Sequence, residues 1–560
     1  MARGWSGRRL LVAVFFVCFA LYAAVGYWLQ VRHGFIIGDA LSRVAAAQSV
    51  LFSRDPHLAA IGFIFTPLTA LAQVPALLLS PVWPDIAERA FSGSLMSAVF
   101  MAGAVIQILG MGLDRGLPRG YALAITAMFA LNPMIVFYGS NGMSEAPFIF
   151  FMTWAVRRLI RWMVDDDVHH LVAAGGIAMG LAYLTRYDAV ACIAAAGLLV
   201  GATTYRRARP APRLRRAMLD TVMVSAPGTV AFIGWVGVSW LITGAAFAQF
   251  TSQYGNTAIL AQSGQVTQTF GAGLLFAVAC IALLAPTLVP ITLWCVARRW
   301  GTPNWQVVLV PLSIYGAALA FQAVSYASGS TFPFLRFYII AVPLTACLAM
   351  LAVPDGALAA AKRRGRYAPV PAPVDTRRHS RTGYVVVALL FAVSLPMTAW
   401  GMSLPQYAPQ EYALATVLAP DRHAVSEHSA LQRRIAASFA TERKISDYLE
   451  GLGLPDSSVI TDTVHGFAIL AATDRPKIFV IPSDPDFTAL LNDPSLGGIK
   501  YLLAVPREGR GVSDALNLRY PTLYETGAEI ATLELEIPND GDSLPDWRLY
   551  RVNEPVIDQQ

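Results

Sequence analysis

An acidic residue stands at the start of the stretch GFIIGDALSRVAAAQSVLFSRDP (residues 34–56), directly after the first apolar segment of the chain. Asp39 precedes a run rich in Ala, Leu and Val (residues 40–52), and Asp55 closes the stretch. This composition predicts a short helix lying along a membrane interface. A carboxylate held at the mouth of a membrane protein can accept a proton or bind a cation, which makes Asp39 a candidate centre of an active site. The alternative is a helix N-cap, because Asp is common at that position.

Other charged residues stand at the predicted outer ends of apolar segments. Such groups are costly there unless they are paired, hydrated or used. We therefore predict one polar cavity shared by five residues: Asp39, Asp55, Glu145, Asp188 and Arg336. Arg43 and Arg186 are expected to neutralise neighbouring acids or to contact an anionic ligand such as phosphate. The alternative is a set of separate interfacial residues, each solvated by water.

Histidines and an acidic run supply weaker candidates. Residues 165–167 (DDD) with His169 and His170 have metal-binding residue types, but a solvated cytoplasmic loop is the favoured interpretation. His465 stands alone in DTVHG, where a structural role is favoured. His57 follows Asp55 closely and is of more interest for that reason.

The composition is that of a membrane protein. Of 560 residues, 55% are hydrophobic and 14% are charged, with a mean hydropathy of +0.51, whereas soluble proteins carry about 25% charge. Many apolar runs reach the roughly 17–25 residues that cross a bilayer. The net charge of +6 comes largely from Arg clusters between these runs, so it reports topology rather than binding of nucleic acid. All five cysteines lie in apolar segments, which argues against a disulfide or zinc site.

Basic loops set the predicted topology. The N-terminal RGWSGRR and the loops at 157–162, 205–216, 297–300 and 362–381 should be cytoplasmic. Segment 58–82 contains three prolines and is predicted to be a re-entrant or interfacial hairpin packing over the site. This leaves about eleven spans and places the C-terminus outside, in a multi-pass protein of the cell membrane. The spans are expected at 10–30, 93–112, 120–138, 145–160, 171–185, 188–204, 220–242, 272–297, 305–326, 337–353 and 383–402.

Two domains are predicted, a membrane domain at residues 1–402 and an extracytoplasmic α/β domain at 403–560. The second part is polar and alternates helical and strand patterns. The helix is expected at ERKISDYLEGLG, and the extended segments at SSVITDT, KIFVIP, GIKYLLAVP, TGAEIA and WRLYRV. It carries no Gly-rich phosphate loop and no GxSxG motif, so we expect a lid or acceptor-docking module rather than a catalytic unit.

Short motifs in residues 1–400 resemble those of one enzyme superfamily. The acid in the first external loop (GDALSR), FTPLTAL, LNPMIVFYGSNGMSEAPF, LAYLTRYDAV and FLRFYIIAVPL occur in that order. In this order they resemble motifs of the GT-C superfamily of membrane glycosyltransferases, and within it the bacterial family 39 mannosyltransferase type. The adjacent Asp-Glu pair of protein O-mannosyltransferases is absent, because Asp39 is followed by Ala40.

The resemblance implies transfer of a sugar from a polyprenyl-phosphate-linked donor to an envelope glycan, lipid or protein acceptor, with inversion at the anomeric carbon. Asp39 is then expected to be the general base. Arg336, Arg186, Arg43 and Tyr187 are expected to bind the donor phosphate or substrate. Glu145, Asp188 and Asp55 are expected to position substrate or to ligate a divalent metal ion, Mg²⁺ or Mn²⁺. Two alternatives stay open at this point, a transporter or flippase for an envelope lipid or glycan and a non-catalytic envelope scaffold.

Overall fold

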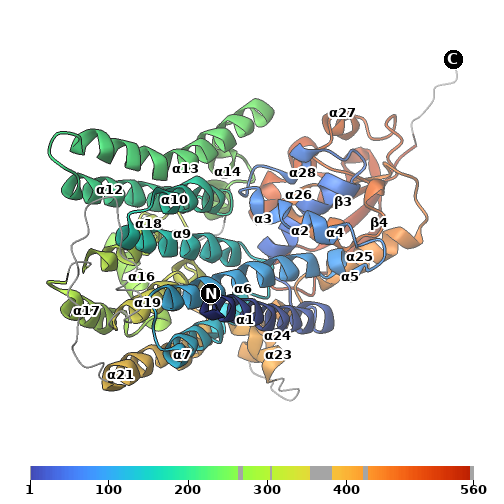
Figure 1. The fold of residues 1–560 in the computed structure, drawn as a ribbon. Helices are drawn as coiled ribbons and strands as arrows, with labels where there is room; N and C mark the ends of the chain where they lie inside the picture. The colour runs from blue at the N-terminus through green and yellow to red at the C-terminus, as the bar shows by residue number, and fades with distance from the viewer. Residues whose placement is uncertain (1, 263–268, 303–304, 354–380, 420–426, 555–560) are drawn as a thin grey trace.

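The computed structural model describes residues 2–262, 269–302, 305–353, 381–419 and 427–554. A helical bundle makes up most of the molecule, and a smaller domain containing a β-sheet sits at one end of it (Figure 1). The N-terminal helix lies within the bundle, whereas the described C-terminus leaves from the smaller domain. The chain is therefore a mainly helical membrane protein with a C-terminal α/β domain, as its composition predicts.

Long apolar helices form the bundle. In the described residues, six are long and apolar enough to cross a bilayer, or seven if a bent pair counts as one span. Helices α1 and α6 pack together, α6 packs on α9, and α12 packs on both α13 and α18. Five of these six contain α1 (Ala2–Gly26), α6 (Phe91–Asp114), α12 (Ala189–Arg207), α13 (Arg213–Thr243) and α18 (Leu309–Ala327), and the sixth is Thr382–Met402. Helix α9 (Glu145–Asp165) is long but is not among them.

The other predicted spans are helical but interrupted. One break coincides with a proline, which has no N–H to donate. Pro286 separates α16 (Phe270–Leu284) from α17 (Leu288–Arg299), and the pair is bent by 73°. The predicted span at 272–297 is therefore a bent pair of helices, and the total of eleven spans stays a prediction. The remaining interrupted segments are α7 (Arg119–Ala130) with α8 (Pro133–Tyr138), α10 (Val168–Leu171) with α11 (Gly180–Tyr183), α19 (Ala341–Leu351) after a 3₁₀ turn, and α21 (Arg381–Ala392) with α22 (Ser394–Met402).

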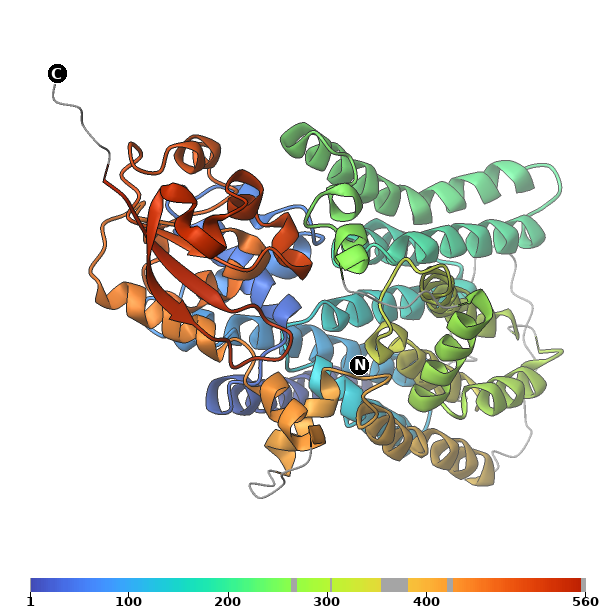
Figure 2. The same cartoon turned by 180° about the vertical axis from the view of Figure 1, so that it is seen from behind.

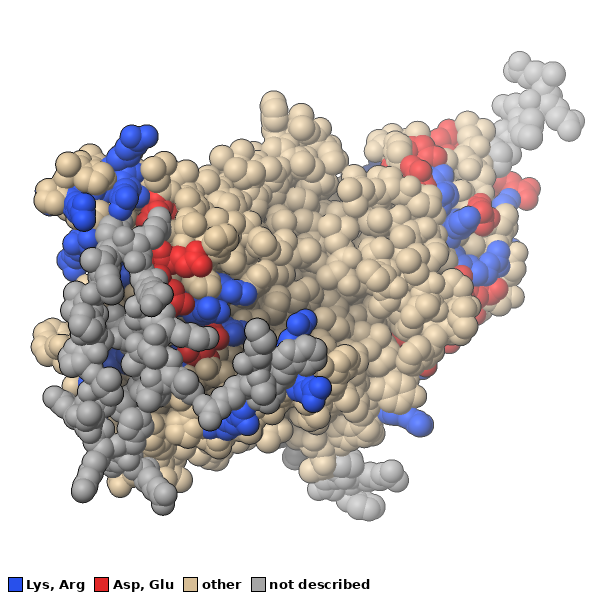
Figure 3. Space-filling model, viewed as in Figure 1, with Lys and Arg blue, Asp and Glu red and all other residues tan. Residues whose placement is uncertain are grey.

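Charged side chains gather at two ends of the molecule. On the face shown in Figure 3, a wide band without charge crosses the bundle between a charged end, with basic and some acidic side chains, and the mixed charges of the C-terminal domain. Helix α13 also exposes apolar side chains, among them Ile233 and Leu241. This pattern is what a helical bundle surrounded by lipid requires.

The stretch around Asp39 forms a helix, α2 (Gly38–Phe52), as predicted. Ile37 takes its N-cap position and Asp39 lies in its first turn, so the N-cap interpretation is wrong. The helix is covered by protein, because it packs against α26 (Thr463–Ala472) of the C-terminal domain and against residues 58–61. Segment 58–82 contains only short helices, among them α3 (Leu68–Leu71) and α4 (Val74–Leu77), in keeping with a proline-bent hairpin.

The C-terminal domain is built on a five-stranded sheet with the order β2-β1-β3-β5-β4, seen face-on in Figure 2. Strands β2 (Phe479–Val480), β1 (Val459–Ile460) and β3 (Tyr501–Ala504) are parallel, whereas β5 (Trp547–Val552) and β4 (Ala531–Ile537) are antiparallel to their neighbours. Four of the predicted strands are correct. The expected strand at TGAEIA is instead a turn, and β4 begins only at its last residue. The predicted amphipathic helix is α25 (Ala440–Gly451).

Residues after the predicted domain boundary at 402/403 still pack on the bundle, since Ala408, Leu414 and Val417 belong to its core. Phe439 and later residues share a second core with α2, and the boundary itself stays a prediction. Composition changes where the spans end, but the polar segment after the last span still packs on the bundle. One of its residues reaches the site described next.

Candidate active site

A cavity of about 1170 Å³ lies between the bundle and the C-terminal domain. Its walls come from residues 38–49 of α2, residues 57–66, the start of α9, the turn before α12, the 3₁₀ turn before α19 and several segments of the C-terminal domain. Of the predicted site residues, seven line the cavity: Asp39, Arg43, Glu145, Arg186, Tyr187, Asp188 and Arg336.

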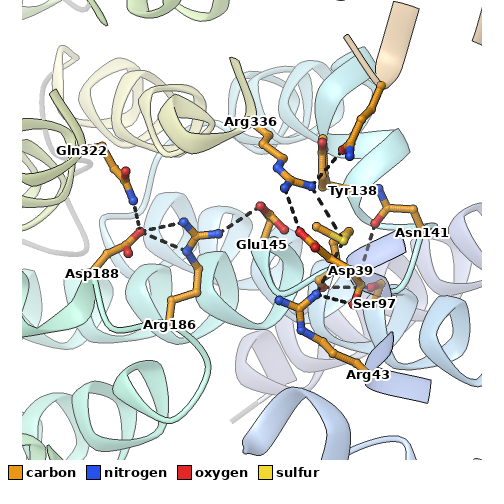
Figure 4. Close-up of polar contacts among 12 residues, drawn as sticks. Asp39, Arg43, Ser97, Tyr138, Asn141, Glu145, Arg186, Asp188, Gln322 and Arg336 are labelled. Atoms are coloured by element: carbon orange, nitrogen blue, oxygen red, sulfur yellow. Dashed lines mark hydrogen bonds and ion pairs between the residues drawn. The ribbon is translucent and has the colours of Figure 1, made fainter. Parts of the chain in front are cut away.

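Asp39 and Arg336 form an ion pair, although 297 residues separate them in the chain. Arg336 Nη2 donates to Asp39 Oδ2 at 2.9 Å (Figure 4). The Arg336 side chain is only 5% exposed, whereas 40% of the Asp39 side chain is accessible. The carboxylate is therefore held by a buried cation and still open to a molecule in the cavity.

A second arginine stands beside Asp39 on the same helix. Arg43 Nη1 donates to the backbone oxygen of Asp39 at 2.8 Å, and its guanidinium lies 4.1 Å from the centre of the Phe65 ring. Burial acts to raise the pKa of Asp39, but the charges of Arg336 and Arg43 outweigh it and lower that pKa below its usual value. Asp39 is therefore ionised at neutral pH.

Arg186 makes the second charged group of the cavity. Its Nη2 donates to Asp188 Oδ2 at 2.8 Å and its Nη1 to Glu145 Oε1 at 3.0 Å. Gln322 donates to the same Asp188 oxygen at 2.6 Å. The Glu145 and Asp188 side chains are 2% and 3% exposed. These acids are buried and neutralised, as expected of Arg186, and Figure 4 shows them beside the Asp39–Arg336 pair.

The loop between α8 and α9 fixes Glu145 at the start of its helix. Gly142 has a φ of +83°, and a Cβ there would stand 3.1 Å from Cα of Gly93 on α6 and 3.2 Å from Cβ of Ala40 on α2. Only glycine suits that conformation and that close approach. Asn141 Oδ1 accepts from the backbone N–H of Met143 at 3.1 Å and holds the turn.

A layer of polar residues supports Arg336 from behind. Gln410, in the segment after the last span, accepts from Arg336 Nη1 at 3.0 Å. The neighbouring Glu411 is buried and accepts from the hydroxyl of Tyr138. The ring of Phe334 lies 4.7 Å from the Arg336 guanidinium. These partners orient Arg336, and sequence reasoning missed them because nothing local marks the segment after a span as part of a site.

The remaining predicted residues are placed less centrally. The Tyr187 ring lines the cavity and packs edge-on against Phe250 at 5.4 Å. Asp55 is not among the lining residues, and its side chain is 51% exposed. Its neighbour His57 does line the cavity. The structure thus brings together every predicted site residue except Asp55.

The other acidic and histidine candidates are engaged locally or lie elsewhere. His169 Nδ1 lies 2.7 Å from Asp167 Oδ1, and His170 Nε2 lies 3.8 Å from Asp165 Oδ2. His169 is solvent-exposed as the loop interpretation expects, but His170 and Asp166 are buried and residues 168–171 form helix α10, so a fully solvated loop is wrong. His465 lines the cavity from the side of the C-terminal domain. The structural role favoured for it did not predict this position.

The described residues do not fit a metal ion well. No group of three His, Cys, Asp or Glu side chains converges among them. Glu145 Oε2 and Asp188 Oδ1 are buried without a hydrogen-bond partner in the described chain, but two such oxygens on acids already paired with Arg186 are a poor set of ligands for a divalent cation. Arginine supplies the positive charge here. We derive no step through a metal ion, and the Mg²⁺ or Mn²⁺ expectation stays a prediction.

Comparison with known proteins gives a structural likeness. No family model and no curated protein sequence matches the chain. The crystal structure of ArnT from Cupriavidus metallidurans bound to undecaprenyl phosphate matches with a TM-score of 0.51 and 15% identity, over 98% of both chains. The apo structure of the same protein gives 0.50 and 16%. The oligosaccharyltransferase AglB from Archaeoglobus fulgidus gives 0.39 and 10%, which is too weak to argue from.

The likeness to ArnT covers the bundle and the C-terminal domain together. The chain therefore has the GT-C fold that its ordered motifs led us to expect. At 15% identity the likeness establishes the fold and not the reaction, and the family 39 type stays a prediction.

Proposed function

We propose that this protein is a glycosyltransferase that takes a sugar from a polyprenyl-phosphate-linked donor. The observation that carries the proposal is an accessible, ionised carboxylate, Asp39, held by the buried Arg336 in a cavity at the ends of membrane helices. The fold shared with ArnT, whose structure holds undecaprenyl phosphate, supports the class of donor.

The chemistry assigns a role to each member of the pair. Asp39 takes the proton of an acceptor hydroxyl while that oxygen bonds to the anomeric carbon of the sugar. The bond from this carbon to the phosphate oxygen breaks, its electron pair stays on the phosphate, and polyprenyl phosphate leaves. Arg336 stabilises the charge that develops on the leaving phosphate. A single displacement of this kind inverts the anomeric carbon.

The ion pair itself has a consequence for this mechanism. A carboxylate with a lowered pKa is a weak base, and Arg336 is one cause of the lowering. A donor phosphate that binds Arg336 competes with Asp39 for the same guanidinium. Binding of the donor therefore raises the basicity of Asp39 at the moment when a base is required.

The other assignments follow from the same donor. Arg43 and Tyr187 line the cavity and are proposed to bind substrate, while Glu145 and Asp188 position Arg186.

The acceptor is an envelope glycan, lipid or protein on the outer face of the cell membrane. The N-terminus then lies in the cytoplasm and the C-terminal domain outside it. Reporter fusions after residue 410 that are active in the cytoplasm would refute this orientation.

A deletion strain tests the proposed function. Mass spectrometry of its envelope should show one missing sugar and an accumulated polyprenyl-phosphate sugar, both restored by the wild-type gene and not by Asp39→Asn at equal expression. Restoration by Asp39→Asn would refute the role of Asp39. An unchanged set of envelope glycans and polyprenyl-phosphate sugars in the deletion strain would refute the reaction.

A further inference from the structure

The C-terminal domain forms one wall of the cavity, which we call the roof. The roof lies at the carboxyl ends of the parallel strands of the sheet. Strand β2 pairs with one side of β1, and the chain then crosses over to β3, which pairs with the other side of β1. The connections after β1 and β3 therefore leave in opposite directions along the sheet. Ligands of open α/β sheets bind outside the carboxyl ends of parallel strands at such a point. Here the loops after β1, β2 and β3 all line the cavity, through residues 463–465, 481–485 and Arg510.

Arg510 is a cation without a carboxylate partner. Of the arginines that line the cavity, Arg336 and Arg186 are ion-paired with acids. No carboxylate of the described chain lies within 4.0 Å of the Arg510 guanidinium. Asp39 is near enough to act on its pKa, which it raises. Burial lowers the pKa of Arg510, which reflects the cost of placing a cation there with little compensation. An anion in the cavity would supply that compensation.

The acid nearest to Arg510 in the C-terminal domain is already engaged. Asp462 Oδ1 accepts from the backbone N–H of Val464 at 2.7 Å, and its Oδ2 accepts from Tyr254 at 2.9 Å and from the backbone N–H of Ala515 at 2.7 Å. Asp462 therefore serves to join the loops of the roof and the bundle, and its oxygens are not available to Arg510.

The neighbouring imidazole, that of His465, does not compete with Arg510 for an anion. Burial and the charge of Arg510 lower the pKa of His465 to about 3. The ring is neutral at physiological pH and lines the same cavity, where it can exchange hydrogen bonds with hydroxyl groups. The roof thus offers one permanent positive charge next to a neutral polar group.

We propose that Arg510 forms a subsite for a negatively charged group, a phosphate or a carboxylate, carried by the acceptor. This inference rests on the proposed function. The donor must keep its apolar tail in the bilayer, so its phosphate meets the arginines that the membrane helices position, Arg336 first. Arg510 comes from the segment after β3 in the C-terminal domain, whereas Arg336 comes from the bundle. An anion that reaches Arg510 therefore enters with the molecule that approaches from outside.

Binding to the full-length protein in nanodiscs tests the subsite. The probes are glucose 6-phosphate, glucose as its neutral counterpart, and undecaprenyl phosphate for the donor side. We expect wild type to bind glucose 6-phosphate about tenfold or more tightly than glucose, the effect of one charged hydrogen bond. Arg510→Gln should lose that preference, Arg510→Lys should keep part of it, and binding of undecaprenyl phosphate should not change.

Arg507→Gln is the matched control, because Arg507 lies in the same loop but is exposed and does not line the cavity. It should behave as wild type. Equal affinity of wild type for glucose and glucose 6-phosphate would overturn the proposal. Equal weakening of sugar phosphate and undecaprenyl phosphate by Arg510→Gln would assign Arg510 to the donor site instead. Failure of wild type to bind undecaprenyl phosphate would refute the proposed donor and leave the anion preference to be judged by itself.

Discussion

The cavity contains two groups of arginine and acid with the same chemistry and opposite settings. Asp39 with Arg336 has an acid that is 40% exposed and one charge of each sign. Arg186 with Glu145 and Asp188 has acids that are at most 3% exposed, and Gln322 adds a further donor to Asp188. The two groups lie side by side (Figure 4), so they differ in exposure although they share one cavity.

Exposure of the acid separates a reactive carboxylate from a structural one. A buried carboxylate that is surrounded by donors holds its neighbours in place, but it has no free path to a substrate. The open side of Asp39 lets an acceptor hydroxyl approach while Arg336 holds the other side. We therefore assign chemistry to the first group and positioning to the second, and the predictions below test that division.

Replacement of Asp39 should have the largest effect on activity. Asp39→Asn keeps the shape and can still accept from Arg336, but an amide cannot take a proton at neutral pH. The rate of transfer should fall by about 10²–10⁴-fold, the usual contribution of a general base, whereas donor affinity should not fall, because a neutral amide competes less than a carboxylate with the donor phosphate for Arg336. Single-turnover kinetics and a donor-binding titration measure the two quantities. Asp55→Asn is the control and should leave both unchanged; a loss equal to that of Asp39→Asn would contradict our choice of base.

Replacement of Arg186 should have the largest effect on stability. Arg186→Leu leaves Glu145 and Asp188 buried without their cation, and breaking a buried pair costs about 3–5 kcal/mol. Thermal unfolding in nanodiscs should show this loss. Arg551→Leu breaks a surface ion pair with Glu534 and should leave stability nearly unchanged. Equal stability of Arg186→Leu and wild type would show that the second group is not structural.

Replacement of Arg336 tests the first group from the side of its cation. Arg336→Ala is expected to weaken both donor binding and the rate of transfer, because the guanidinium meets the phosphate in the ground state and the transition state. Arg336→Lys should restore only part of each, since an ammonium group lacks the planar fork that contacts Asp39 and Gln410 together. Comparison of KM with kcat for both variants checks this. Full recovery by lysine would mean that charge alone suffices.

Much of the fold, and most of the residues that meet in the cavity, could be predicted from the sequence. The apolar runs, the Arg-rich loops and the ordered motifs pointed to the fold, and acids at helix ends pointed to one shared cavity that contains Asp39, Glu145, Asp188 and Arg336. These signals are local, because a residue type at the end of an apolar run is visible without knowledge of its neighbours. Asp55 met the same criterion, but its side chain is 51% exposed and does not line the cavity, although His57 two residues later does.

The missing parts depend on contacts that no local pattern encodes. Gln322 lies on an apolar helix, Gln410 follows the last span, and Arg510 lies in a loop of a separate domain, yet all three complete the site. The exposure of each acid is equally hidden, because burial of Asp188 and access to Asp39 result from packing of distant helices. The sequence therefore predicted which residues meet, but not which of them stays open.

The smallest expected effect is a shift in pH dependence that only the first group should show. Burial acts to raise the pKa of Asp39, but Arg336 and Arg43 lower it overall. A lowered pKa means that the ionised form stabilises the fold above the unfolded value of about 3.9, and that this contribution is lost as pH falls through the folded value. The acid limb of kcat/KM should therefore lie below the ordinary range of Asp in wild type. Arg336→Gln removes the larger favourable charge and leaves burial in place, so the limb should move to higher pH, whereas Arg507→Gln should not move it. A limb at the same pH in Arg336→Gln and wild type would mean that the group titrating in the free enzyme is not Asp39.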